Sequence, residues 1–245
     1  SRSSWAFPVV VVKKFDSRGN HTGWRCCVDY RRLNKILRDN DMNYPLSLID
    51  QCLDNMHGAQ WFTTCDISAA YQQLGVHPDS VPKTSFVTST GQFEFLRVPF
   101  GIKSAPSLLS RLGDLIFKGL KWQVMNLYLD DILIFSQTFE DHIRDVNTVL
   151  QRLEDAGLTL NPTKCKWCQP EVDFLGYVVG RDGIKPNPAK VKAITEFPAP
   201  TDLSSLRSFL GLATYYRRFI RSFSTLAAPL NQLLCKGVKW QWGPD

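Results

Sequence analysis

Two adjacent aspartates stand between two of the most apolar strand segments of this chain. Residues 123–129 and 132–136 are rich in residues that favour β-strands, and Asp130 and Asp131 lie between them. Carboxylates are costly to bury beside such strands unless they are solvated or neutralised by a partner. The pattern therefore predicts a hairpin whose tip carries two acids, and an ordinary solvated aspartate turn is one interpretation of it.

A third acid follows the same pattern elsewhere in the chain. Residues 60–66 form a short strand-like run that ends at Asp66. If the two strand ends lie side by side, three carboxylates gather within a few ångströms, and they stay ionised together only if a cation neutralises them. Hard oxygen ligands suit Mg²⁺, and a pair of such ions serves in-line displacement at phosphorus. Nucleases, phosphatases and polymerases all use this chemistry, so the spacing alone leaves these classes open.

The composition indicates a folded protein with an acidic partner. The chain has 245 residues, of which 44% are hydrophobic, and a formal net charge of +6. Its longest aliphatic run is Val9–Val12, far short of the roughly 18 apolar residues of a membrane span, so we expect no membrane association. The first residue is Ser1 and no export signal follows, so we expect a piece of a longer chain.

The cysteine pattern favours a reducing compartment. Seven cysteines at irregular spacing make an odd count in a chain long enough to fold without disulfides. Cys165 and Cys168 have the spacing of half a zinc site, but no second ligand pair accompanies them. We interpret the cysteines as small packing residues, and these are Cys26, Cys27, Cys52, Cys65, Cys165, Cys168 and Cys235.

The order of elements is mixed α and β first and helical at the end. Hydrophobic periodicity and turn residues predict a hairpin over 7–15 and 24–28, with its turn at 17–20. Further strands are predicted at 60–66, 83–88, 92–98, 123–129, 132–136 and 172–179. Helices are predicted from about residue 45 to 58, where Ser47 and Asp50 suggest a capping box, and at 104–120, 138–156, 188–197, 201–220 and 224–236.

Several blocks, taken in order, resemble one known family. They are PVVVVKK (8–14), WRCCVDYRRLNK (24–35), VPFG (98–101), YLDDILIFS (128–136), FLGY (174–177), LRSFLGLA (206–213) and YYRRFI (215–220). Each block alone is a weak signal, but together they span nearly the whole chain. The sequence resembles the reverse transcriptase of long-terminal-repeat retrotransposons of the Ty3/gypsy type, which is related to retroviral polymerases.

The resemblance implies an α+β fold in the form of a right hand. The fingers would comprise residues 1–41 and 74–104. The palm would comprise 42–73 and 105–181, as a ferredoxin-like antiparallel sheet with packed helices. Residues 182–245 would form a helical thumb and the start of the connection, and the ribonuclease H domain of the family would be absent from this sequence.

The resemblance also assigns the catalytic centre. Asp66, Asp130 and Asp131 match the family's catalytic aspartates, which would hold two Mg²⁺ ions, with Mn²⁺ as a substitute. Asp66 and Asp130 would bridge the ions, Asp131 would act less directly, and the backbone carbonyl of Ile67 would complete the site on the nucleotide side. Lys164 corresponds to a position proposed to protonate the departing pyrophosphate, although a surface lysine is an equally good interpretation.

Binding residues follow from the same comparison. Tyr71 would pack under the incoming sugar and exclude a 2′-hydroxyl, Lys14 and Arg25 would grip the triphosphate, and Phe100 and Gly101 would line the nucleotide pocket. Contacts with primer and template are expected from Tyr128, Phe174, Leu175, Gly176, Tyr177, Arg217 and Arg218, in which the block 174–177 resembles the primer grip.

The implied function is RNA-directed DNA polymerisation. The partners would be an RNA template, a DNA primer/template duplex, deoxynucleoside triphosphates, and the ribonuclease H and integrase regions of the same Pol polyprotein. The expected location is the cytoplasm, within virus-like particles. Two alternatives stay open: a catalytically inert nucleic-acid-binding remnant of such an element, and a two-metal nuclease.

Overall fold

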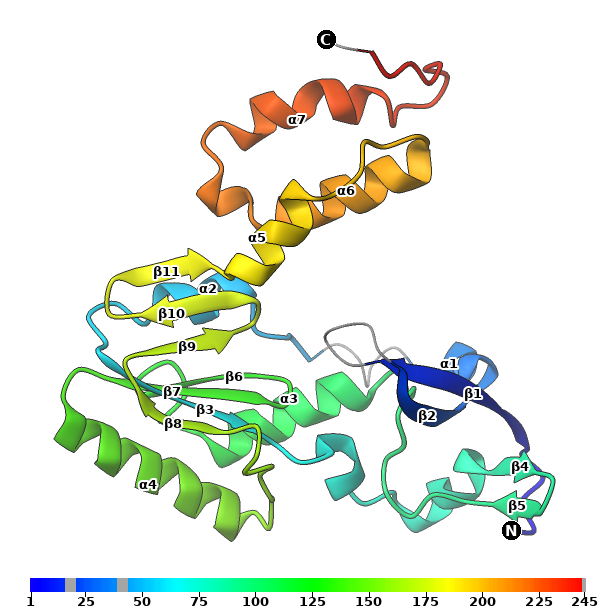
Figure 1. The fold of residues 1–245 in the computed structure, drawn as a ribbon. Coiled ribbons are helices and arrows are strands. Elements are labelled where there is room, and N and C mark those ends of the chain that lie inside the picture. Colours follow the sequence, from blue (N-terminus) through cyan, green and yellow to red (C-terminus); the bar gives the residue numbers. More distant parts are fainter. Residues whose placement is uncertain (16–20, 39–43, 244–245) are drawn as a thin grey trace. The chain divides into compact units, whose positions relative to one another are not determined.

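The computed structural model describes residues 1–15, 21–38 and 44–243 (Figure 1). They form two compact units, residues 1–172 and residues 173–245. Helices and largely antiparallel sheets make up the fold, which confirms the predicted α+β class. The predicted ranges of fingers, palm and thumb stay a prediction. Within the described residues, no helix is both long enough and apolar enough to cross a membrane.

A four-stranded antiparallel sheet forms the centre of the N-terminal unit, with strand order β6-β7-β3-β8. Along the chain its elements follow the sequence strand, helix, strand, strand, helix, strand, which is the ferredoxin-like arrangement. The elements are β3 (Trp61–Asp66), α3 (Ala105–Ile116), β6 (Met125–Tyr128), β7 (Asp131–Ser136), α4 (Phe139–Asp155) and β8 (Lys166–Gln169).

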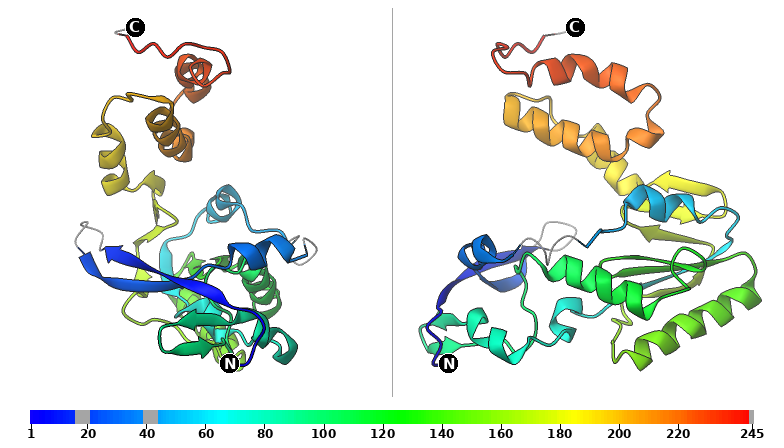
Figure 2. Two further views of the ribbon diagram at one scale, coloured as in Figure 1. Left: turned by 90° about the vertical axis from the view of Figure 1, so that its right-hand side faces the viewer. Right: turned by 180° about the vertical axis from the view of Figure 1, so that it is seen from behind.

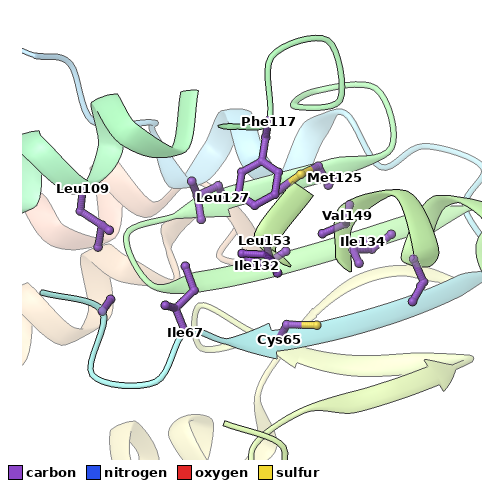
Figure 3. Close-up of a cluster of buried hydrophobic side chains, with 12 residues drawn as sticks. Cys65, Ile67, Leu109, Phe117, Met125, Leu127, Ile132, Ile134, Val149 and Leu153 are labelled. Atoms are coloured by element: carbon purple, nitrogen blue, oxygen red, sulfur yellow. The ribbon is translucent and has the colours of Figure 1, made fainter. Parts of the chain in front are cut away.

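Helices α3 and α4 pack against one face of this sheet, and apolar side chains fill the space between them (Figure 3). Ile132 and Ile134 of β7 point into this core and are completely buried. Because side chains alternate along a strand, Asp131 and Leu133 lie on the opposite face. Strand β7 is thus apolar and buried on both faces, and Asp131 lies at its exposed first position.

Helix α4 has the ends that its sequence predicts. The side chain of Thr138 accepts a hydrogen bond from the backbone N–H of Asp141 at 3.1 Å, which caps the first turn. At the other end Gly157 adopts a φ of 66°, and its N–H bonds the carbonyl of Glu154 at 2.9 Å. These local bonds end helix α4 before the segment that leads to β8.

The opposite face of the sheet carries the shorter helix α2 (Ile49–Asp54). The side chain of Asn126 in β6 donates to the carbonyl of Cys52 at 2.6 Å and so holds the helix against the sheet. The predicted capping box is wrong, because the helix begins at Ile49 after Leu48, and no side chain caps its first turn. Tertiary packing on β6, rather than a cap, holds this helix.

A second sheet, of order β2-β1-β4-β5, lies in the N-terminal part of the unit. The predicted hairpin is confirmed, whereas its predicted turn at 17–20 falls outside the described residues. The strands predicted at 83–88 and 92–98 are much shorter, since a 3₁₀ helix, η3 (Pro78–Thr84), takes up the start of the first. The elements are β1 (Phe7–Phe15), β2 (His21–Val28), α1 (Arg31–Ile36), η2 (Ala70–Gln73), β4 (Phe86–Thr88) and β5 (Gly91–Phe93).

The C-terminal part of the chain builds a three-stranded sheet, of order β11-β10-β9, followed by helices (Figure 2). The single strand predicted at 172–179 is wrong, because Leu175 and Gly176 have positive φ values of 48° and 76° and turn the chain back. The elements are β9 (Glu171–Phe174), β10 (Tyr177–Gly180), β11 (Gly183–Pro186), α5 (Pro188–Thr195), α6 (Leu203–Tyr215), the 3₁₀ helix η4 (Arg217–Phe219) and α7 (Phe223–Gln232).

The close approach of α3 to β6 depends on Gly113. A Cβ atom at this position would fall 2.0 Å from Cδ2 of Leu127, whose side chain is buried. Because the helix or the leucine must then shift within a packed core, we expect Gly113→Ala to lower the free energy of unfolding by about 1–3 kcal/mol in urea denaturation.

Gly211 in α6 provides the matched control, since no atom lies within 4 Å of a Cβ placed there. Alanine favours a helix over glycine by about 1 kcal/mol, so Gly211→Ala should raise stability slightly or leave it unchanged. A Gly113→Ala protein as stable as the parent chain would contradict the tight packing of α3 on β6.

Candidate active site

The register between β3 and β7 brings the predicted carboxylates to one end of the sheet. Asp66 pairs directly with Asp131, and Tyr128 pairs with Asp131 on the other side. Leu129 and Asp130 thus form a two-residue hairpin turn, in which Leu129 has a φ of 55°, an uncommon value for a branched side chain. The N–H of Ile67 donates to the carbonyl of Asp130 at 3.0 Å, which fixes this turn beside the end of β3.

The electrostatics of Asp131 reflect this crowding. Its pKa is raised to about 6, first because neighbouring atoms desolvate the carboxyl group and then because Asp130 and Asp66 carry like charges nearby. The Lys164 ammonium opposes this shift. One carboxylate raises the pKa of another only at short range, so the structure brings together the three aspartates that the sequence predicted.

Lys164 lies against the same cluster. Its Nζ is 3.1 Å from Oδ2 and 3.3 Å from Oδ1 of Asp66, and most of its side chain is exposed. The segment that carries it is tied to the end of β3, because the N–H of Asn161 donates to the carbonyl of Asp66 at 2.9 Å. The N–H of Lys164 in turn donates to the Asn161 carbonyl at 3.1 Å. These bonds place the predicted proton donor beside a predicted catalytic acid.

The donor set fits a hard divalent cation in charge and in type of atom. Carboxylate oxygens of Asp66 and Asp130 and the carbonyl of Ile67 are the ligands that Mg²⁺ prefers. Desolvation and then the charges of Asp130 and Asp66 raise the pKa of Asp131, and Lys164 only partly offsets this shift. Across residues 1–15, 21–38 and 44–243, no group of three or more His, Cys, Asp or Glu side chains is arranged as a metal site. The three aspartates thus lie together at one end of the sheet, without a complete set of metal ligands among the described residues.

Two aromatic rings flank the cluster. Tyr71 packs edge-on against Phe100, with ring centroids 5.7 Å apart and an angle of 89° between the ring planes. Burial raises the pKa of Tyr71, and the charge of Asp130 raises it further, which puts the phenol near this acid. Phe100 is 53% exposed and is followed by Gly101, whose φ of 91° favours glycine. The predicted nucleotide-pocket residues thus meet at the edge of the carboxylate cluster.

The predicted triphosphate-binding residues lie on the β1–β2 hairpin. Arg25 of β2 pairs with Val12 of β1, and Lys14 lies two residues after Val12 in β1. Paired residues and residues two apart share a face, so both cations point to the same face of the hairpin. Both side chains are exposed. Among the contacts of the described residues, none joins Lys14 or Arg25 to the three aspartates.

The predicted primer-grip block forms the turn between β9 and β10. The hydroxyl of Tyr216 donates to the carbonyl of Gly176 at 2.9 Å, and the hydroxyl of Tyr215 donates to the carbonyl of Leu175. Tyr177 is buried, and its hydroxyl donates to the Tyr215 carbonyl at 2.8 Å. The end of α6 thus holds this turn through its tyrosines, a role that the sequence analysis did not assign to them.

The remaining predicted nucleic-acid contacts have mixed environments. Tyr128 is partly buried at the end of β6, and Phe174 is 3% exposed in β9. Arg217 and Arg218 are exposed on η4, where the Arg218 guanidinium lies 6.0 Å from the ring of Phe219. The burial of Phe174 indicates a structural contribution, whereas both arginines are accessible to a phosphate backbone.

Two amide side chains near the cluster were missed by the sequence analysis. Gln73 donates to the carbonyl of Thr159 at 3.0 Å and accepts from its N–H at 2.8 Å, which links the segment after β3 to the segment before β8. Asn34 donates to the carbonyl of Gly101 at 2.7 Å and accepts from the N–H of Lys103 at 2.9 Å. Their partners are distant in sequence, so no local pattern identifies either residue.

Comparison with known proteins agrees with this geometry. Residues 12–179 match the family model described as "Reverse transcriptase (RNA-dependent DNA polymerase)". The chain is 38% identical over 98% of its length to the "Retrovirus-related Pol polyprotein from transposon 297" and 39% identical over 96% to that from transposon gypsy, both of Drosophila melanogaster. It is 36% identical over its full length to the Tf2-3 polyprotein of Schizosaccharomyces pombe. The chain covers only 22%, 22% and 18% of these three relatives.

Solved structures give the same result for the fold. One is the structure titled "foamy viral protease-reverse transcriptase dRH in complex with ds DNA". The match covers 100% of this chain and 42% of the foamy viral chain, with a TM-score of 0.89 and 25% identity. A second, of the foamy viral protease-reverse transcriptase in complex with RNA/DNA hybrid, covers 100% of this chain and 32% of its own, with a TM-score of 0.84. The chain therefore belongs to the reverse transcriptase family and is similar to the Pol polyproteins of Ty3/gypsy-type retrotransposons.

Proposed function

We propose that this chain is the core of an RNA-directed DNA polymerase, which adds deoxynucleotides to a primer 3′-hydroxyl on an RNA or DNA template. The observation that carries the proposal is the pairing of Asp66 with Asp131, with Asp130 in the adjoining turn. Few functions other than the handling of phosphate with divalent cations explain three acids held together at the end of a buried sheet.

The carboxylates would act as ligands and as fixed charges. Asp66 and Asp130, with the carbonyl of Ile67, would hold two Mg²⁺ ions, for which Mn²⁺ would substitute. Bound there, the ions would lower the pKa of the attacking hydroxyl and stabilise the charge of the leaving group. Asp131 would strengthen the negative field of the site from the neighbouring strand position. Catalysis would then consist of positioning and electrostatic stabilisation, as in phosphoryl transfer generally.

The nucleotide would be held by side chains around the cluster. Tyr71, beside Phe100 and close to Asp130, presents a flat surface against which a 2′-hydroxyl would collide. Lys14 and Arg25 share one exposed face of the hairpin and would bind the triphosphate, the arginine through paired hydrogen bonds and the lysine as a point charge. Tyr71 would thus select deoxynucleotides by shape, and Lys14 and Arg25 would hold them by charge.

Lys164 would donate a proton to the departing pyrophosphate. Its ammonium lies 3.1 Å from Asp66 and is largely exposed, so it is close to the reacting groups and accessible to a leaving phosphate. Its ion pair with Asp66 would keep the side chain in this position before the nucleotide arrives.

Nucleic acid would bind through backbone contacts, because a copying enzyme reads its template by base pairing and not by side chains. Tyr128, the turn 174–177 and the exposed Arg217 and Arg218 are the proposed primer/template contacts. The solved relatives were bound to double-stranded DNA and to an RNA/DNA hybrid, which supports the same duplexes as partners of this chain.

As a part of a Pol polyprotein, the chain would work beside its ribonuclease H and integrase regions. The location that follows from this proposal is the cytoplasm, within virus-like particles, where an RNA template would be packaged with the enzyme.

The extension of a primer tests the catalytic assignment. On poly(rA)/oligo(dT) with Mg²⁺ and dTTP, we expect Asp130→Asn and Asp66→Asn each to lower the rate at least about a hundredfold, on the order of 3 kcal/mol of transition-state stabilisation. Asp155→Asn, at the exposed end of α4, is the control and should extend at the parent rate. A well-folded parent chain that binds the duplex but adds no nucleotide would support the inert remnant instead.

The charge of Asp131 should make the cation-free protein less stable at neutral pH. Its folded-state pKa of about 6 lies above the ordinary value of 3.8, so the folded chain holds this proton more tightly than the unfolded chain does. The penalty for ionisation therefore grows as the pH rises from about 4 to about 6 and is complete above that range. In calorimetry with EDTA, Asp131→Asn should raise Tm at about pH 7.5, and this gain should shrink at about pH 4.5.

Asp155→Asn again serves as the control, because this exposed residue lies outside the cluster. Because Asp131 is exposed at the start of β7, solvent screens its charge and the gain in Tm should be small. A Tm of Asp131→Asn that equals the parent value at both pH values would show that neither desolvation nor the neighbouring carboxylates penalise the ionised Asp131 in the folded chain.

A further inference from the structure

Two thiols lie directly beneath the ion pair of the candidate active site. Cys65 immediately precedes Asp66 at the end of β3, and Cys165 lies between Lys164 and Lys166, the first residue of β8. The two strands are antiparallel, with Thr64 paired to Lys166. Each cysteine adjoins one member of this pair, so the backbone brings the two cysteines near each other.

The side chains of this pair meet in the core. Cys65 belongs to the apolar cluster under α3 and α4, and Cys165 packs against the same cluster (Figure 3 shows Cys65 in it). Cys65 is 2% exposed, whereas Cys165 is partly exposed and its sulfur lies 3.2 Å from the Asn161 carbonyl. Neighbouring strands of a sheet lie about 4.7–4.9 Å apart, a separation that a disulfide spans.

We propose that Cys65 and Cys165 are a redox pair that closes into a cross-strand disulfide and thereby modifies the active site. Each cysteine is the chain neighbour of one member of the Asp66–Lys164 ion pair, so a bond between the thiols acts on the backbone of both predicted catalytic residues. The reduced form is the one described here, in which all seven cysteines are free.

A small disulfide such as oxidised glutathione would serve as the oxidant that forms the Cys65–Cys165 bond. Cys165 is the thiol accessible to solvent, so its sulfur attacks the glutathione disulfide and releases one glutathione thiolate. The Cys65 sulfur then displaces the second glutathione and forms the Cys65–Cys165 bond. The two protein thiols lose two electrons and two protons, and one glutathione disulfide becomes two glutathione thiols.

Closure of the bond would act on Asp66 and Lys164. An S–S bond of about 2.05 Å with a Cβ–S–S–Cβ dihedral of about 90° imposes one geometry on the two cysteines, which constrains the end of β3 against the segment before β8. The two strand ends carry the predicted ligand and the predicted proton donor, so both shift, and the lysine is held against the carboxylate. This expectation rests on the proposed function. We expect the rate of primer extension to fall at least about tenfold, since misplacement of catalytic groups by ~1 Å lowers a rate by up to about a hundredfold.

Peptide mapping tests the bond independently of activity. The whole chain is incubated with oxidised glutathione, alkylated, digested and analysed by mass spectrometry. We expect a peptide pair joined through Cys65 and Cys165 that has lost two hydrogen atoms and separates with dithiothreitol. Cys165→Ser and Cys65→Ala should each abolish this pair, whereas Cys235→Ser, at an exposed thiol of the C-terminal unit, should keep it.

Two results would overturn the proposal. The first is full alkylation of Cys65 and Cys165 under conditions in which the exposed Cys235 forms a mixed disulfide with glutathione. The second is a mapped Cys65–Cys165 bond that leaves primer extension unchanged, which would remove its effect on the site. Reduced chain that extends no primer but still forms the bond would instead contradict the proposed function, so the two failures are distinguishable.

Discussion

The pairing of β3 with β7 is the constraint on which the candidate site depends. Its register puts Asp66 opposite Asp131, and the two-residue turn before β7 adds Asp130 at the same end of the sheet. The apolar cluster under α3 and α4 holds both strands in this register, so the packing of the core keeps like charges together. The pKa of Asp131 is raised by desolvation and then by the like charges of Asp130 and Asp66, and Lys164 offsets this only in part.

Much of this arrangement could be predicted from local sequence. The continuous apolar run from Ile132 to Phe135 identified a strand, and Thr138 and Gly157 marked the ends of α4. The acids at two strand ends suggested a shared site, and the order of the motifs identified the family. These features depend on residues that are neighbours in the chain, or on a pattern that the family shares, and therefore need no knowledge of tertiary contacts.

Other features depend on contacts between distant residues and were missed or wrong. Helix α2 is held against the sheet by Asn126 of β6, which donates to the Cys52 carbonyl, and no side chain caps its first turn, so local capping rules failed there. The strand predicted at 172–179 breaks because tyrosines of α6 stabilise the turn at Leu175. The contact of Cys65 with Cys165 likewise arises only when β8 pairs with β3, although each cysteine adjoins a motif residue.

The most direct test of the account is a count of the divalent cations bound at the carboxylates. Mn²⁺ binding can be measured by electron paramagnetic resonance on the metal-free chain with a dideoxy-terminated primer/template and the matching deoxynucleotide. The account predicts two tightly bound ions per chain, and the loss of at least one in Asp66→Asn and Asp130→Asn but not in Asp155→Asn. Equal binding by the parent chain and all three variants would contradict the convergence of these acids on a shared cation site.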